Sequence, residues 1–152
     1  MAKLGLKTFC DEFKAYENKV GKGRAWSELL SEVGNAAKNE STRSFERQQS
    51  PFSEAWAELS PASLKRKKGS LKLVESGHLK RSIQSHSDLN KKAVSVGSNL
   101  HYAAIHQFGG KAGRGHKTTI PARPFLPISA DDKLAPQLET RIDKILNRFL
   151  EL

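Results

Sequence analysis

Apolar residues recur at helical spacing at both ends of this chain, and this periodicity limits the folds open to it more than any other feature. Positions three, four or seven residues apart lie on one face of a helix, which can then be buried. The pattern predicts helices over residues 3–19, 25–49 and 131–150. The positions that carry it are Leu6, Phe9, Cys10 and Phe13, then Trp26, Leu29, Leu30 and Val33, and finally Leu134, Leu138, Ile142, Ile145 and Phe149.

Glycine and proline separate these helices. The run Gly21-Lys22-Gly23 breaks the first from the second, and Ser50-Pro51 ends the second, because the residue before proline avoids helical geometry. Gly34 and the polar residues 39–42 predict a kink inside the second helix. We expect Ser129, Asp131 or Asp132 to cap the last helix.

The middle of the chain has a different period. Residues 93–98 (AVSVGS) alternate between apolar and polar side chains, as a half-buried strand does, and residues 79–87 are a second candidate strand. Turn-forming residues at 87–91 predict that the two strands form an antiparallel hairpin. Residues 125–129 predict a third strand at an edge, since proline has no donor for the ladder.

Two short helices complete the pattern. Residues 61–67 follow Ser60, a good cap, and residues 101–108 end at Gly109-Gly110. The sequence therefore predicts an α+β fold with N-terminal helices, a small antiparallel sheet and a C-terminal helix. We expect a single domain over residues 1–152, with a helical part (1–49), an α+β core (50–129) and a last helix (130–152).

Positive charge is concentrated in the middle of the chain. The protein has 152 residues and a formal net charge of +10, and residues 60–125 hold 13 Lys or Arg against two acids. Such a region attracts polyanions by releasing their counterions, and it suits an acidic protein surface equally well. It could also serve only to keep the surface solvated.

The sequence offers little catalytic or metal chemistry. His101 and His106 are five residues apart, which is not the spacing of a helical zinc pair, and no cysteine pair accompanies them. The single cysteine, Cys10, is expected to be a small core residue. Residues 60–125 contain only Glu75 and Asp88 as acids, too few for a metal-dependent nuclease. We therefore predict no enzyme activity, no cofactor and no metal site. No run approaches the 18 apolar residues of a membrane span, so no membrane partner is expected.

Residues 99–125 (NLHYAAIHQFGGKAGRGHKTTIPARPF) carry the most specific pattern. A short apolar helix leads into a glycine- and cation-rich loop, and the segment closes on Ile120-Pro121-Ala122-Arg123-Pro124-Phe125. The loop resembles a phosphate loop only loosely, because a helix precedes it instead of a strand. Glycine would let it project and order on contact with a partner. Arg123 could pair with a carboxylate or hold the base of the loop.

These residues resemble the phage virion morphogenesis family, which includes the tail completion proteins of Mu-like and related long-tailed phages. The resemblance covers residues 42–129 and depends on the order of several short motifs. They are Ser50-Pro51 with Trp56-Ala57-Glu58-Leu59, Leu73 with Ser76-Gly77, Leu79 and Ser82-Ile83, Val96-Gly97-Ser98-Asn99, Tyr102-Ala103, Ile105 to Gly110, and Ile120 to Leu126. The sequence departs from the family at Phe52-Ser53, where relatives often have a small residue and a glycine.

The resemblance implies a structural phage protein without catalytic residues. Such proteins complete the tail or join it to the head-side connector, as rings, often of six subunits, at the tail end. The implied partners are further copies of the chain, tail tube and connector proteins, and DNA passing through the lumen. The implied location is the virion tail or neck, and the host cytoplasm before assembly. The alternative is a nucleic-acid-binding protein without sequence specificity. Against it, the basic residues 63–70 contain no aromatic, and Tyr102 and Phe108 are expected to pack inside the protein.

The candidate functional residues form two groups. The expected contacts with other subunits or partners are Lys111, Arg114, His116, Lys117 and Arg123. The residues expected to shape the family motif are Trp56, Gly77, Tyr102, His106, Phe108, Gly109, Gly110, Pro121, Pro124 and Phe125.

Overall fold

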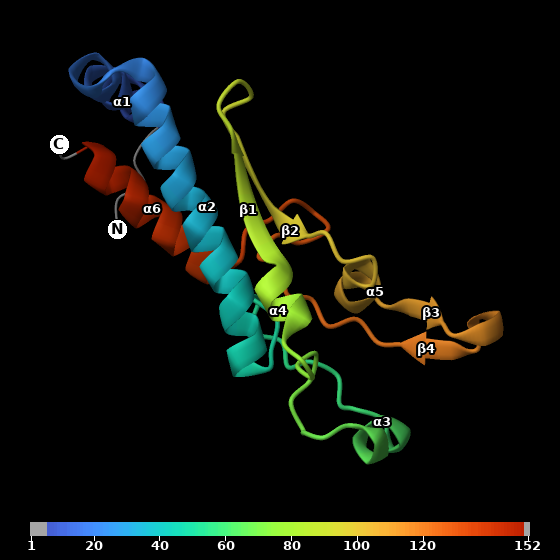
Figure 1. Cartoon of the computed structure of the whole chain (residues 1–152). Coiled ribbons are helices and arrows are strands. Elements are labelled where there is room, and N and C mark those ends of the chain that lie inside the picture. The colour runs from blue at the N-terminus through green and yellow to red at the C-terminus, as the bar shows by residue number, and fades with distance from the viewer. Residues whose placement is uncertain (1–5, 151–152) are drawn as a thin grey trace.

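The computed structural model describes residues 6–150, apart from the side chains of residues 6–10, 12 and 150. Two helices, α1 (Leu6–Val20) and α2 (Lys22–Arg47), pack against the C-terminal helix α6 (Pro136–Leu150). A hairpin of β1 (Ile83–Asp88) and β2 (Ala93–Ser98) lies along α2. The predicted α+β fold, with N-terminal helices and a C-terminal helix, is confirmed (Figure 1).

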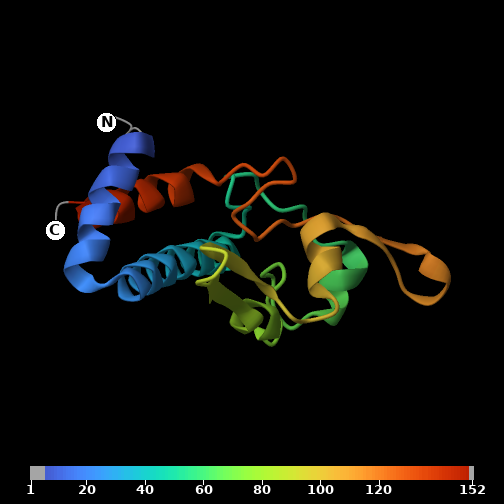
Figure 2. The ribbon, with the colours of Figure 1, turned by 90° about the horizontal axis from the view of Figure 1, so that it is seen from above.

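The remaining elements lie beside the C-terminal end of α2 and beyond it (Figure 1). They are the short helices α3 (Pro61–Arg66), α4 (His78–Ser82) and α5 (Ala103–Phe108), and a small hairpin of β3 (Gly110–Ala112) and β4 (Thr118–Ile120) with one turn, η1 (Arg114–His116), at its tip. The molecule is elongated, with α1 and the end of α6 at one end and the β3–β4 hairpin at the other (Figure 2).

Helix α2 connects two apolar cores. Near α1 and α6 the core contains Phe13, Tyr16, Leu29, Leu138 and Phe149, all at most 9% exposed. Near the far end of α2 a second core surrounds Phe45; it contains Trp56, Leu79, Ile83, Ala103 and Phe125. Because one continuous helix contributes to both cores, the helical bundle of α1, α2 and α6 is fixed relative to the half of the molecule that carries the motif residues.

Gly34 lets the β1–β2 hairpin approach α2. The predicted kink at this glycine is wrong, because residues 22–47 form one uninterrupted helix. A Cβ atom at Gly34 would lie 3.2 Å from the Ser85 Oγ and 3.3 Å from the Val94 Cγ1. The glycine thus serves close packing between helix and hairpin. The break between α1 and α2 is Gly21 alone, at φ 92°, whereas Lys22 and Gly23 already belong to α2.

The antiparallel hairpin was predicted correctly, but its first strand begins later than expected. Residues 78–82 form α4, which starts after Gly77 in a left-handed conformation (φ 72°), and β1 begins at Ile83. Ile83 pairs with Ser98 and Asp88 with Ala93. The Asp88 Oδ1 accepts hydrogen bonds from the Asn90 and Lys91 amides and so closes the turn.

Three other boundaries differ from the prediction. Residues 125–129 do not form a strand; Ile128 makes one isolated bridge with Leu134. The last helix begins at Pro136, so neither Ser129 nor the aspartates cap it, and the Ser129 Oγ instead accepts from the Lys133 amide. The glycine-rich segment is partly ordered as β3 and β4. The Ser60 cap is confirmed, since its Oγ accepts a hydrogen bond from the Ser63 amide at 3.2 Å.

Gly34→Val should destabilise the protein. Its branched side chain would collide with Ser85 and Val94, and overpacking of this kind costs about 1–3 kcal/mol. The matched control is Gly23→Ala in the same helix, where a Cβ would meet nothing within 4 Å. That control should leave the stability unchanged or raise it by up to about 1 kcal/mol. Urea unfolding measures both, and equal midpoints for the two variants would contradict the packing role of Gly34.

Candidate functional site

Helix α5 is tied to the segment that follows the β3–β4 hairpin. The Gln107 side chain is buried, and its Oε1 accepts hydrogen bonds from the backbone amides of Phe125 at 2.9 Å and Leu126 at 3.1 Å. The Arg123 amide donates to the His106 carbonyl at 2.7 Å. Two passes of the chain, one before and one after the hairpin, are therefore fixed to each other at its base.

Arg123 fastens a third segment to this base. Its side chain is only 6% exposed, and its guanidinium donates to the Ala57 carbonyl at 2.8 Å and the Glu58 carbonyl at 2.9 Å. The nearby Trp56 donates its Nε1 hydrogen to the Pro124 carbonyl at 2.7 Å. Of the two roles considered for Arg123, the structure shows the one at the base of the loop. Its predicted contact with a partner stays a prediction.

The other four expected contact residues lie together on the β3–β4 hairpin, here called the arm (residues 109–120). Lys111, Arg114, His116 and Lys117 are all exposed, and none forms a salt bridge with a described residue. No acid occurs between residues 89 and 130. The arm is thus cationic without compensating acids, and it projects at the end of the molecule opposite α1 (Figure 2).

Glycines shape the base and the tip of the arm. Gly109 has φ 73°, and a Cβ there would lie 2.9 Å from the Ala122 amide nitrogen, so only glycine allows the two passes to approach this closely. At the tip, Gly113 (φ 78°) and Gly115 (φ 69°) also have left-handed or related backbone conformations. The base is therefore constrained by contact, and the tip by backbone conformation alone.

The residues of α5 face three directions. Ala103 and Gln107 are buried, whereas Tyr102, which caps the helix, and His106 are half-buried on another side. Phe108 is 72% exposed. The expectation that Phe108 packs inside the protein is therefore wrong.

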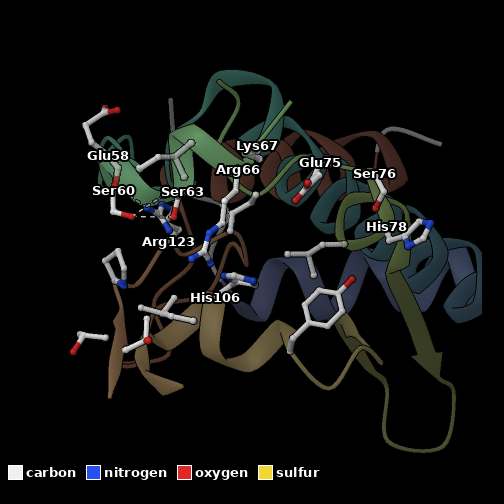
Figure 3. A pocket seen from close by; sticks show the side chains of 18 of the residues that line it. Glu58, Ser60, Ser63, Arg66, Lys67, Glu75, Ser76, His78, His106 and Arg123 are labelled. Atoms are coloured by element: carbon white, nitrogen blue, oxygen red, sulfur yellow. Dashed lines mark hydrogen bonds between the residues drawn. The ribbon is translucent and has the colours of Figure 1, made fainter. Parts of the chain in front are cut away.

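A groove of about 670 Å³ runs between α3, residues 73–79, α5 and β4 (Figure 3). Its apolar lining comes from Leu59, Leu73, Leu79, Tyr102, Ile120 and Pro121. Arg66, Lys67, His78, His106 and Arg123 also line it, with Glu58 and Glu75 as the acids. The Lys67 Nζ donates to the Leu71 carbonyl, and Glu58 pairs with Lys72 at 2.6 Å. The sequence did not reveal this groove, because its walls come from segments far apart in the chain.

His106 points into the groove toward Arg66 and Arg123 (Figure 3). Its Nδ1 is buried and has no hydrogen-bond partner in the structure. Burial, and to a lesser extent the charge of Arg123, lowers the pKa of His106 below its ordinary value of 6.5. The neutral ring is therefore the form that this environment favours.

The remaining motif residues are structural in position. Trp56 and Phe125 lie in the second core, and Gly77 starts α4. Cys10 lies in α1, but its side chain is outside the described part of the molecule. Among the residues whose side chains are described, no group of three or more His, Cys, Asp or Glu could hold a metal ion. Within that part of the chain no helix is long and apolar enough to cross a membrane.

Arg123→Ala should lower the free energy of unfolding by about 2 kcal/mol, because the protein loses a buried side chain and the two charge-assisted hydrogen bonds that it donates to the carbonyls of Ala57 and Glu58. Arg123→Lys keeps the charge but supplies a single ammonium, so it should recover part of the loss. Arg114→Ala is the control, since Arg114 is exposed at the tip of the arm, and it should change stability by less than about 0.5 kcal/mol. Denaturant titration decides, and equal losses at positions 114 and 123 would refute the anchoring role.

His106 should make the stability depend on pH. Since its pKa is lower in the folded protein than in the unfolded chain, the unfolded chain binds the proton more readily. The contribution of His106 to stability is then complete above about pH 6.5 and is lost as the pH falls toward the folded-state pKa. Comparing unfolding of the wild type and His106→Gln from about pH 8 to about pH 5 isolates this effect. As the pH falls, the free energy of unfolding of the wild type should decrease more than that of His106→Gln. Parallel pH profiles of the two would contradict the role of His106.

Comparison with known proteins agrees with the motifs. The model of the phage virion morphogenesis family matches residues 11–150, so the match extends beyond residues 42–129 into α1, α2 and α6, where only generic helices were expected. "Mu-like prophage FluMu G protein 2" of Haemophilus influenzae is 54% identical over 61 residues, which are 40% of this chain and 43% of that protein. The chain thus covers less than half of this relative's length. No solved structure matches. The chain belongs to the phage virion morphogenesis family and has a structural role in the morphogenesis of a phage virion.

Proposed function

We propose that the protein completes the phage tail, or joins the tail to the head-side connector, as a subunit of a ring at the tail end. The observation that carries the proposal is the arm: an exposed cationic hairpin on a fixed base, in a member of this family. A subunit that joins two assemblies needs a body that keeps its shape and a projection that reaches a neighbour.

The body meets the first need. α2 contributes to both apolar cores, and Arg123, Gln107 and Trp56 fix the base of the arm by side-chain hydrogen bonds. A fixed base lowers the entropy lost when the arm binds, because the direction of the arm is set before contact. The arm itself has no apolar core and extends away from the helices (Figure 1).

The charge of the arm favours a partner that carries negative charge. Lys111, Arg114 and Lys117 are exposed without a salt bridge to any described residue, so their charges act outward. In a ring, these residues would contact an acidic face of the tail tube or connector, and residues lining the lumen would meet passing DNA. The free protein is expected to be monomeric or weakly associated, since the +10 net charge opposes self-association.

Electron microscopy of particles made without this protein tests the proposal. A phage that lacks the gene should yield filled heads separated from tails, or tails of abnormal length, whereas a complemented control should yield complete particles. Complete, normal particles in the absence of the protein would refute the structural role at the tail.

Removing the charge of the arm should block assembly without unfolding the protein. The variant Lys111→Ser/Arg114→Ser/Lys117→Ser should lower the yield of infectious particles by about tenfold or more, because the charges of the arm would no longer steer it toward an acidic partner. The control Lys14→Ser/Lys22→Ser/Lys144→Ser removes the same charge from exposed positions of the helical bundle. Both variants should unfold at the wild-type temperature. Equal yields from the two would show that the position of the charge is irrelevant.

The alternative, a nucleic-acid-binding protein, gains one argument from the structure. Phe108 is exposed beside a cationic surface, so the reason given against stacking no longer applies to this residue. Micromolar binding to arbitrary duplex DNA that weakens steeply with salt would favour this function. The same assay with the arm variant locates the binding surface.

A further inference from the structure

We propose that copies of this chain associate head to tail, with Phe108 of one copy seated in the groove between α3, α5 and β4 of the next. The proposal rests on the ring of the proposed function and names the contact that would build it. It starts from two features: Phe108, which at 72% is the most exposed of the large apolar side chains that the structure describes, and a groove of about 670 Å³ whose mixed lining includes six apolar residues.

The backbone at Phe108 is held in a fixed position. It ends α5, whose neighbouring residue Gln107 is buried and bonded to two backbone amides. The next residue, Gly109, donates its amide hydrogen to the Ile105 carbonyl at 2.9 Å and lies against the backbone of Ala122. The backbone on both sides of Phe108 is therefore held in place. Exposed aromatic residues with little backbone freedom are the usual anchors of protein interfaces, because binding costs them little entropy.

The groove can receive such a side chain. Its apolar lining, described above, contains aliphatic side chains and the ring of Tyr102. Pockets of about 300–1,000 Å³ accept groups of drug size, so a phenylalanine side chain fits with room for its flanking backbone. Residues of this groove are also held firmly, since Leu79 is 4% exposed and Arg123 is bonded to two carbonyls.

The positions of Phe108 and the groove determine how the copies would be arranged. A helical residue is rotated by about 100° from the one before it, so Phe108 lies about 200° around α5 from His106. His106 and Tyr102 line the groove, whereas Ala104 and Phe108 form the exposed side of the helix. Phe108 and the groove therefore face nearly opposite directions. Two copies therefore cannot each place Phe108 in the groove of the other, and each copy must contact two different neighbours. Contacts of this kind produce rings or open chains.

A second copy fits this groove better than an acidic peptide on two grounds. The complementary feature, an unoccupied aromatic anchor, is present on the chain itself. The groove lining also carries only a small net positive charge, since Glu58 and Glu75 accompany Arg66, Lys67 and Arg123, so it is not a strong anion site. The whole chain carries +10, so copies repel one another. Salt should therefore strengthen the association by screening that repulsion, whereas it would weaken the binding of an acidic peptide or nucleic acid.

Sedimentation velocity of the purified full chain over rising concentration tests the contact. The wild type should self-associate reversibly, more strongly at high salt. Phe108→Ala should raise the dissociation constant by about tenfold or more, and Leu89→Ala, at a 48% exposed position on the tip of the other hairpin, should leave it unchanged. Thr119→Trp and Ser76→Trp fill the groove from two different walls, and each should also abolish association. Thermal unfolding of all four variants checks that they fold.

Mixing the variants gives the decisive result. Phe108→Ala keeps an intact groove, and Thr119→Trp keeps an intact Phe108, so each alone should associate far more weakly than the wild type. An equal mixture of the two should form a dimer and nothing larger. A mixture that stays monomeric, a wild type that is monomeric at every concentration, or association that weakens with salt would overturn the proposal. If Phe108→Ala lowers particle yield while the wild type stays monomeric, Phe108 docks on another virion protein, and the second copy is excluded. Because these measurements use purified protein, their failure is separate from the particle morphology that tests the proposed function.

Discussion

The side chain of Gln107 holds together the half of this protein that carries the motif residues. Residues 125 and 126 lie beside α5 outside any strand, and no neighbouring strand among the described residues satisfies their amides. The Gln107 carbonyl oxygen accepts both hydrogen bonds in a buried place, where an unpaired amide would cost about 1–3 kcal/mol. This arrangement seats Phe125 in the second core and directs the arm away from the body. The groove, the arm and the exposed Phe108 all depend on the placement of α5 that results.

Much of the fold could be predicted from the sequence because its long elements have clear periods. The three long helices and the β1–β2 hairpin were located to within a few residues, apart from the later start of α6. The errors have physical causes. Leu79 and Ile83 read as alternate positions of a strand, but they are also four residues apart, and both are buried across the boundary between α4 and β1. Residues 125–129 read as a strand, but the amides of Phe125 and Leu126 bond to the Gln107 side chain, and the Ser129 amide donates to the Lys133 carbonyl.

The candidate site was predictable only in part. Four of the expected contact residues lie on one projecting arm, because their shared glycine-rich segment was already visible in the sequence. Arg123 was harder to place, since a cation between two prolines gives no sign of the carbonyls of Ala57 and Glu58, more than 60 residues earlier, to which it bonds. Phe108 was assigned to the interior because aromatic residues usually lie there. Helix α5, which carries Phe108, has a buried side, a half-buried side and an exposed side. The helical spacing of its apolar residues does not show which of these sides is exposed.

The unequal constraints on the glycines of the arm have a consequence for how related phages diverge. Gly109 is restricted twice, by a positive φ and by the approach of the Ala122 backbone to within 2.9 Å of any Cβ. Gly115 is restricted by φ alone, a conformation that asparagine also adopts. Substitutions should therefore be rare at the base and frequent at the tip, where a change in sequence alters the exposed surface without moving the scaffold. Members of this family should then share one subunit body and differ mainly in a few exposed residues at the tip of the arm.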